Sequence, residues 1–337
     1  SDVCSSDLAL QAGVPESVPC AVVSKVCGSG MKAVLQAHDA LLAGSARVVL
    51  AGGMESMSNA PYLLPKARGG QRLGHGQMLD HMFLDGLEDA YAPDTRGRLM
   101  GTFAEDCARS HGFSREAQDA WAIDTTRRAQ QAQARGAFDW EIAPVRLATR
   151  QGEREVCADE SPTKVQIDKV PTLKPAFAPD GTVTAANASS ISDGAAALVL
   201  TRRSVAQAEG WPVLATVRAH ATHAQAPALF TTAPVGAVQK VLTRAGWQVA
   251  DVELFEVNEA FAVVTLAAIQ ALALNPTRVN VHGGACALGH PIGASGARIL
   301  VTLLGALRQR GLRRGVATLC IGGGEATAIA IELEAHA

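Results

Sequence analysis

The chain has 337 residues, of which 48% are hydrophobic and 18% charged. This composition excludes a disordered protein and supplies ample material for a buried core. Thirty Lys and Arg residues against 32 Asp and Glu leave a net charge of −2, which argues against the broad basic face that nucleic acid or an anionic membrane surface requires. The seven cysteines include no C-x-x-C pair, so we expect free thiols in a reducing, cytoplasmic setting.

The first predicted elements are a strand, a helix and a second strand. Residues 20–26 form an apolar run rich in β-formers. Ser29 is then a candidate helix N-cap, and apolar residues recur at helical spacing until Gly44, a candidate stop signal. A buried strand is predicted over residues 47–51, ending at the Gly-Gly pair of residues 52–53.

Residues 57–190 have a different character, because Gly- and Pro-rich stretches alternate with two polar helices. A capping box of Thr102 and Glu105 predicts the start of one helix, and Ser114 predicts the start of the other, which runs towards Gly136. An irregular segment of this length inside a compact protein predicts a loop domain that covers a ligand.

The C-terminal part repeats the opening pattern. Residues 260–274 are the longest apolar stretch, which is short of the ~20 residues that span a bilayer and therefore predicts a core helix. A helix opening at residues 293–296 and closing at Gly311 precedes a strand over 316–321 and a run of three glycines. The repeat predicts two similar α/β halves, with sites where strands end and helices begin.

Two residues at these junctions carry candidate chemistry. Cys27 follows the first predicted strand and precedes a helix, whose dipole is expected to lower the thiol pKa; a buried strand-end cysteine is the equal alternative. His290 lies in a Gly-rich loop before the matching helix, where Pro291 restricts the backbone; a structural or exposed histidine is the alternative. If the halves are pseudo-symmetric, these two residues face each other as nucleophile and base.

Two further residues extend this set. Cys320 ends the last predicted strand before three glycines, whose backbone N–H groups could bind an oxyanion; core packing is the alternative. Asn258 follows the run of residues 254–257 and could orient a water or a carbonyl. An ordinary helix cap is the alternative for Asn258.

Nucleotide and metal motifs are not predicted. The Gly28-Ser29-Gly30 segment lacks the third glycine of a dinucleotide-binding loop, and no P-loop follows any glycine run. The histidine pairs 75/81 and 220/223 lack a complete ligand set at metal-binding spacing. We therefore predict no metal site.

Four segments taken together closely resemble the thiolase family. They are KVCGSGMKA at 25–33, NEAFA at 258–262, GGACALGHPIGASG at 283–296 and CIGGG at 320–324. They occur in the order in which the family carries them. Within the family, residues 53–58 and 181–189 resemble the members that condense two acetyl-CoA molecules into acetoacetyl-CoA.

The resemblance implies a thiolase-like α/β fold, with two similar βαβαβαββ halves in an α-β-α-β-α layer arrangement and an inserted loop domain. Residues 1–56 and 191–210 would form the N-terminal half, 57–190 the loop domain over coenzyme A, and 211–337 the C-terminal half. The family's opening region, with its central strand, is expected to be missing here. Residues 1–8 resemble translated library-adapter sequence, so authentic sequence is expected to begin near Ala9 and the function to be that of the intact parent protein.

The resemblance also implies roles for the catalytic residues. Cys27 would take an acyl group from coenzyme A, with His290 as its general base, and Cys320 would remove or return the α-proton of a second acetyl-CoA. The backbone N–H groups of Cys27 and Gly322 would form one oxyanion hole, and His290 with a water held by Asn258 the other.

Substrate contacts follow from the same motifs. Ser189 and Met100 would line the pantetheine tunnel. The expected coenzyme A-binding set is Ser189, Met100, Ala185, Ala260, Phe261 and Gly322. No permanently bound cofactor is implied; acetyl-CoA, acetoacetyl-CoA and coenzyme A are the expected substrates and products. The assembly implied is a homodimer or homotetramer, with no nucleic-acid or membrane partner.

One departure from the family leaves alternatives open. Many biosynthetic members carry His-Met where this chain has Leu99-Met100, which bears on acyl-chain preference. A 3-ketoacyl-CoA thiolase of longer chains in β-oxidation is therefore one alternative, and a non-catalytic thiolase-like binder of coenzyme A or lipid is another. A ketoacyl synthase is disfavoured by the terminal Cys-x-Gly-Gly-Gly motif.

Overall fold

The computed structural model describes residues 5–90 and 93–334. Its helices are α1 (Ser5–Gln11), α2 (Ser29–Ala43), α3 (Met100–His111), α4 (Arg115–Ala134), α5 (Ser161–Lys164), α6 (Arg203–Glu209), α7 (Ala233–Ala245), α8 (Ala262–Leu272), α9 (Ala285–Leu288) and α10 (Ile292–Arg310). Short 3₁₀ or π turns are η1 (Val26–Gly28), η2 (Met57–Asn59), η3 (Phe83–Leu87), η4 (Ile167–Thr172), η5 (Pro227–Thr232), η6 (Val249–Asp251) and η7 (Pro276–Arg278).

The strands form one four-stranded sheet and three two-stranded sheets. They are β1 (Val48–Ser56), β2 (Tyr62–Leu63), β3 (Leu79–Asp80), β4 (Val145–Thr149), β5 (Gly152–Val156), β6 (Asp193–Thr201), β7 (Ala215–Ala224), β8 (Leu254–Val257), β9 (Arg314–Ile321) and β10 (Glu325–Leu333). The larger sheet has the order β7-β10-β9-β8, with β8 and β9 parallel and the other pairs antiparallel. Strands β1 and β6 pair antiparallel, from Val48 opposite Thr201 to Ser56 opposite Asp193.

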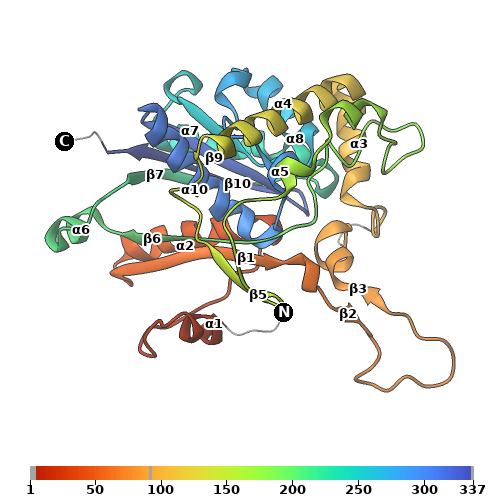
Figure 1. The fold of residues 1–337 in the computed structure, drawn as a ribbon, viewed down its shortest axis with the longest axis horizontal. Helices are drawn as coiled ribbons and strands as arrows, with labels where there is room; N and C mark the ends of the chain where they lie inside the picture. The colour runs from red at the N-terminus through yellow and green to blue at the C-terminus, as the bar shows by residue number, and fades with distance from the viewer. Residues whose placement is uncertain (1–4, 91–92, 335–337) are drawn as a thin grey trace.

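Helices α2 and α10 lie between these two sheets. Helix α10 contacts β1 and β6 on one side and β8 and β9 on the other, and α2 packs along α10 and against β1 (Figure 1). Helix α7 covers the opposite face of the four-stranded sheet, where it also contacts α8. The layer order is therefore helix, sheet, helix, sheet. The outer face of the β1–β6 sheet is exposed at Leu50 (62%) and Val199 (69%).

The central layer holds much of the core. Helix α10 buries one stripe completely, at Ile299, Leu300, Leu303 and Leu307, and burial of each such side chain contributes about 1.5–3 kcal/mol. The predicted core helix within residues 260–274 is confirmed as α8. No helix among the described residues is long and apolar enough to cross a membrane.

The predicted helices at the two motif regions are confirmed. Helix α2 ends at Gly44 and α10 at Gly311, and both glycines adopt the left-handed conformation that only glycine takes readily, with φ of 77° and 65°. Ser29, however, is the first residue of α2 and Gly28 is its N-cap. The Ser29 hydroxyl instead donates to Val26 O at 2.8 Å.

Three other sequence predictions are wrong. Residues 20–25 are not a strand, because a strand needs a hydrogen-bonded partner and none lies beside them among the described residues. Thr102 and Glu105 do not form a capping box: Leu99 is the N-cap of α3, and the Glu105 carboxylate accepts the N–H groups of residues 182 and 183. Strand β1 continues through Gly52 and Gly53 to Ser56, because these glycines permit close approach rather than a turn. The strand is also not buried as predicted, since Val48 and Leu50 are exposed on its open face.

The crossing of α2 and α10 depends on Gly30. A Cβ atom at this position would lie 2.8 Å from Gly293 O and 3.0 Å from Ala297 N, both backbone atoms of α10. We expect Gly30→Ala to lower the free energy of unfolding by about 1–2 kcal/mol, because overpacking forces the helices apart. Urea denaturation measures the loss. Gly69→Ala is the matched control, since its Cβ would meet only Lys66 O at 4.0 Å; equal midpoints for the two variants would contradict the prediction.

Candidate active site

The catalytic candidates are brought together where η1, β9 and α10 meet. Cys27 lies in η1, directly before α2; Cys320 lies near the end of β9; and His290 stands two residues before α10. Both β9 and α10 pack against η1. The two motif regions, 263 positions apart in the chain, therefore lie against each other, and the pairing of Cys27 with His290 stays a prediction.

The turn that carries Cys27 has an unusual backbone. Val26 has φ of 47°, in the left-handed region that a β-branched residue rarely adopts. Two hydrogen bonds hold this turn: Lys25 N–H donates to Ser29 Oγ at 2.8 Å, and Ser29 Oγ–H donates to Val26 O at 2.8 Å. Strain of this kind persists only where the surroundings enforce it.

The Cys27 thiol differs from its prediction. A helix dipole was expected to lower its pKa, but desolvation by the surrounding protein raises the pKa of Cys27 to about 11, and the hydrogen bonds from Gly322 N–H and its own N–H offset only part of this effect. The resting group is thus a neutral thiol that needs a base. The same two N–H groups are those expected to bind an oxyanion.

His290 is held in one tautomer. Its Nδ1 lies 2.5 Å from Ser295 Oγ, and that hydroxyl donates its single proton to Pro291 O at 2.8 Å. The hydroxyl must therefore accept from Nδ1–H, which leaves Nε2 as the basic nitrogen. Burial, followed by the charge on Arg298, lowers the pKa of His290 to about 4, so the ring is neutral at physiological pH and can accept the thiol proton.

Ser295 is a positioning residue that the sequence analysis did not single out. We expect Ser295→Ala to lower kcat about 10- to 100-fold with little change in KM, a part of the 10²–10⁴-fold that a positioned base supplies. Steady-state kinetics test this, and Ser295→Thr, which keeps the hydroxyl, is the matched rescue variant. A merely structural role would instead lower the amount of folded protein and leave kcat per folded molecule unchanged.

Asn258 lies against the histidine. Its Nδ2 is 3.4 Å from both ring nitrogens of His290, and its buried Oδ1 has no hydrogen-bond partner among the described residues. Asn258 is not a helix cap, since α8 begins at Ala262 with Phe261 as N-cap. A buried carbonyl oxygen beside an imidazole suits a water or a substrate group, which the sequence analysis expected.

Cys320 completes the set. Its side chain is 1% exposed, and burial raises its pKa well above the ordinary value, with a further rise from the charge on Cys27. A thiol with so high a pKa is a strong base once ionised, which is what removing a proton from carbon demands.

The structure places the expected coenzyme A positions in three groups. Ser189 donates through both N–H and Oγ–H to Ala260 O at 3.0 Å, beside the isolated bridge between Ala188 and Phe261. Met100 and Gly322 line a narrow pocket with Val26, Leu84, Gly86 and Glu88. Ala185 is exposed, and no contact of its side chain ties it to the centre in the described residues.

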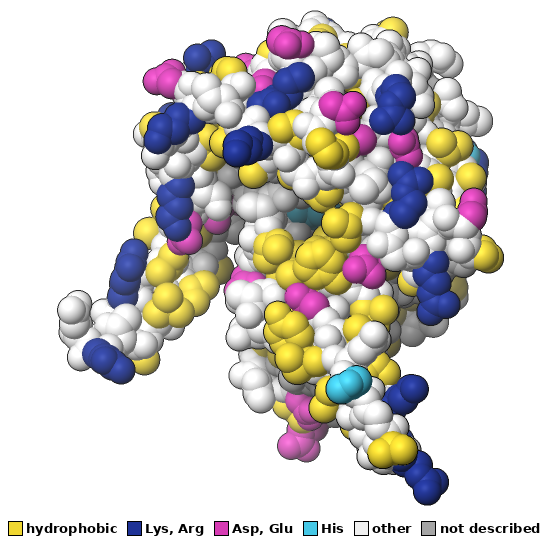
Figure 2. All heavy atoms as spheres, turned by 90° about the vertical axis from the view of Figure 1, so that its right-hand side faces the viewer, with side chains coloured by type: hydrophobic (Ala, Val, Ile, Leu, Met, Phe, Trp, Pro, Cys, Tyr) yellow, Lys and Arg dark blue, Asp and Glu magenta, His cyan; other side chains and the backbone are white. Residues whose placement is uncertain are grey.

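The face beside α3 and the β2–β3 segment is hollowed (Figure 2). Hydrophobic side chains gather in the hollow, and separate Lys and Arg side chains stand around it rather than forming a continuous basic surface. An apolar channel with scattered cations at its rim suits a long thioester that carries phosphate groups at one end.

Glu259, the residue after Asn258, is a buried acidic residue that the sequence analysis did not single out. The buried carboxylate accepts hydrogen bonds from Trp121 Nε1 at 3.0 Å, Asn280 Nδ2 at 2.8 Å and Cys286 N at 3.1 Å. Burial raises its pKa, and these donors oppose the rise. The signal available in the sequence was an acidic residue directly before the long apolar stretch of residues 260–274.

Comparison with known proteins gives the family. Residues 2–204 match the protein family described as "Thiolase, N-terminal domain", and residues 211–333 match the family described as "Thiolase, C-terminal domain". The chain belongs to the thiolase family. Like other thiolases it is therefore an acyltransferase by family, and the predicted family and fold class are confirmed.

Individual thiolases agree over most of the chain. It is 50% identical to "Acetyl-CoA acetyltransferase 1" of Arabidopsis thaliana, over 96% of this chain and 78% of that protein. It is also 50% identical to the acetyl-CoA acetyltransferase of Escherichia coli, over 96% of this chain and 82% of that one. The solved Acat5 thiolase of Ascaris suum, in complex with coenzyme A, superposes with a TM-score of 0.90 at 42% identity, covering 98% of this chain and 83% of that one.

Proposed function

We propose that this thiolase is an acetyl-CoA C-acetyltransferase, which condenses two acetyl-CoA reversibly into acetoacetyl-CoA and coenzyme A. The observation that carries this proposal is the 50% identity, over 96% of the chain, to proteins named for that activity. The meeting of η1, β9 and α10 supports it, because two thiols, a neutral imidazole and directed backbone N–H groups are what the reaction requires.

The first half-reaction transfers acetyl to Cys27. Nε2 of His290 takes the thiol proton as Sγ attacks the thioester carbonyl, and the N–H groups of Cys27 and Gly322 stabilise the oxyanion. The bond from carbon to the coenzyme A sulfur then breaks, and Cys320 gives its proton to that sulfur, which leaves Cys320 ionised and His290 protonated. The raised pKa of Cys27 makes this base necessary, since the free thiol ionises only near pH 11.

The second half-reaction forms the carbon–carbon bond. The Cys320 thiolate takes an α-proton from the second acetyl-CoA, whose enolate oxygen is stabilised by His290 and a water held by Asn258. The carbanion attacks the acetyl carbon of acetyl-Cys27, the carbon–sulfur bond breaks, and His290 returns the proton that it holds to the departing Cys27 sulfur. The two half-reactions together convert two acetyl-CoA into one acetoacetyl-CoA and one coenzyme A.

We assign binding roles by the same proposal. Ser189, Met100, Ala260, Phe261 and Gly322 would contact the pantetheine arm, and Ala185 would lie farther out, which its exposure supports. The domain division proposed is 1–56 with 191–210, then 57–190 over coenzyme A, then 211–337. The pairing of β1 with β6 supports joining the first two ranges.

The proposal extends to the cellular setting. Coenzyme A thioesters act as substrates and no cofactor is permanently bound. We further propose a cytoplasmic homodimer or homotetramer in fatty acid metabolism, for which the free thiols of the described cysteines and the family membership are the support.

The deciding experiment compares substrates. Thiolysis of acetoacetyl-CoA is expected to have a higher kcat/KM than thiolysis of 3-ketoacyl-CoA of eight or more carbons. A preference for the longer chain would favour a β-oxidation thiolase instead, a possibility that Leu99-Met100 keeps open. Binding of coenzyme A without turnover by folded protein would identify a non-catalytic binder and overturn the proposal.

A further inference from the structure

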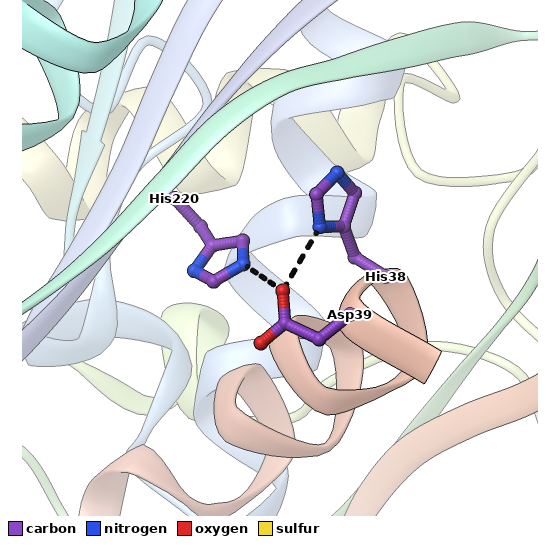
Figure 3. Close-up of side chains that lie close together, drawn as sticks. All are labelled: His38, Asp39 and His220. Atoms are coloured by element: carbon purple, nitrogen blue, oxygen red, sulfur yellow. Dashed lines mark hydrogen bonds and ion pairs between the residues drawn. The ribbon is translucent and has the colours of Figure 1, made fainter. Parts of the chain in front are cut away.

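A second cluster of chemistry-bearing side chains lies away from the catalytic centre. His38 and Asp39 stand near the end of α2, and His220 projects from β7 towards them (Figure 3). Oδ1 of Asp39 accepts hydrogen bonds from His220 Nε2 at 2.8 Å and from His38 Nδ1 at 3.3 Å. The three potential ligand atoms all lie within 4.8 Å of one another.

This His-Asp-His cluster, defined as His38, Asp39 and His220, is separate from the acyl chemistry. Asp39 lies ten residues beyond Ser29, the start of α2 beside Cys27, which corresponds to about 15 Å along a helix. Its members belong to the two sequence regions that match the N- and C-terminal thiolase domains. Anything bound here would join α2 to β7 rather than touch substrate.

The ligand set has a definite chemical preference. Two imidazole nitrogens and one carboxylate oxygen suit Zn²⁺, Co²⁺, Ni²⁺ or Cu²⁺ rather than Mg²⁺ or Ca²⁺, which prefer oxygen alone. Oδ1 of Asp39 lies within hydrogen-bond distance of a nitrogen of both rings, so one carboxylate oxygen can reach the same ion as the two imidazoles.

An ion can reach the cluster from solvent, and neighbouring groups hold the three side chains in place. The side chains of His38, His220 and Asp39 are 21%, 16% and 57% exposed, so an ion can arrive from solvent and keep a water ligand. The two rings meet edge to face at 5.0 Å between centroids. On β7, Arg244 Nη1 donates to His220 O at 2.7 Å, which fixes the strand at this residue.

We propose that the His-Asp-His cluster is a binding site for a divalent transition cation such as Zn²⁺, with three protein ligands and a fourth position open to water. Binding displaces the ring protons that now point at Asp39 and replaces two hydrogen bonds with three coordination bonds. Because the ligands come from α2 and β7, the ion cross-links the central helix to the four-stranded sheet and stabilises the folded state.

The test is a calorimetric titration of the whole chain with Zn²⁺, after the reactive thiols, the exposed Cys20 and Cys157 included, have been alkylated with iodoacetamide so that they cannot bind the metal. One equivalent of tight binding is expected, together with a Zn²⁺-dependent rise in Tm. His220→Gln, His38→Gln and Asp39→Asn are each expected to weaken binding by about 10-fold or more and to remove the rise in Tm.

The matched control is His223→Gln on the same strand, since the His223 ring packs at Gly236 of α7, on the other side of the sheet. It should bind Zn²⁺ like the unmodified sequence. Co²⁺ then reports the ligand type: a tetrahedral spectrum without a thiolate charge-transfer band supports the proposal. Binding that survives His220→Gln, a cobalt–thiolate band, or no binding at all would each overturn it.

Discussion

Cys27→Ala is expected to abolish the acetyl-enzyme and to lower kcat at least about 10³-fold, because no other group at the meeting point of η1, β9 and α10 replaces the nucleophile. Brief exposure to acetyl-CoA followed by intact-mass measurement should show one acetyl adduct on the parent chain and none on the variant. The alanine occupies less space than the thiol, so the fold should survive the change.

The control for this experiment is Cys20→Ala, which removes an exposed thiol outside the four motif segments. It should acquire the acetyl group as the parent does. If Cys27→Ala retains the adduct, the acyl group resides on another side chain, and the assignment of Cys27 as nucleophile is wrong.

His290→Asn has the second largest expected effect, a 10²- to 10⁴-fold slower acetylation of Cys27. Its pH dependence is distinctive. Because burial lowers the pKa of His290 to about 4, the ring stays unprotonated as pH falls from 8 to 5.5. The acetylation rate of the parent chain should therefore show no decline near pH 6.5, where an ordinary histidine would become charged.

Alkylation by iodoacetamide shows whether His290→Asn has lost only the general base or has also altered the Cys27 thiol. Iodoacetamide reacts with the thiolate, so its rate should rise about tenfold per pH unit below the Cys27 pKa of about 11. At pH 10 the parent and His290→Asn should be alkylated at similar rates. His75→Ala, at an exposed position, should match the parent in both assays; an inflection of its acetylation, or the parent's, near pH 6.5 would contradict a neutral buried imidazole.

Helix periodicity and glycine stops were sufficient to predict α2 and α10, and the length of one apolar stretch was sufficient to predict α8, since these depend on local signals. The extension of β1 through Gly52 and Gly53 could not be predicted that way. A glycine pair looks like a stop signal in one dimension, whereas here a Cβ at Gly53 would lie 2.0 Å from Gly293 O, in a segment 240 positions away.

In the candidate site, too, some features could be predicted from local sequence and others depend on the three-dimensional structure. The motifs located Cys27, Asn258, His290 and Cys320, but the Cys27 pKa was predicted in the wrong direction because a dipole argument omits burial. The part played by Ser295 depends on which way a hydroxyl points. The His-Asp-His cluster joins residues 181 positions apart, so no local spacing announces it.

The backbone of Val26 has a consequence for how activity is lost on heating. Its left-handed φ of 47° sets the direction in which the Cys27 N–H points, and only the contacts around η1 keep it from relaxing to an ordinary value. Local loosening of these contacts requires less free energy than global unfolding. Thermal inactivation should therefore precede the loss of secondary structure, with enzyme that is inactive yet folded at intermediate temperatures.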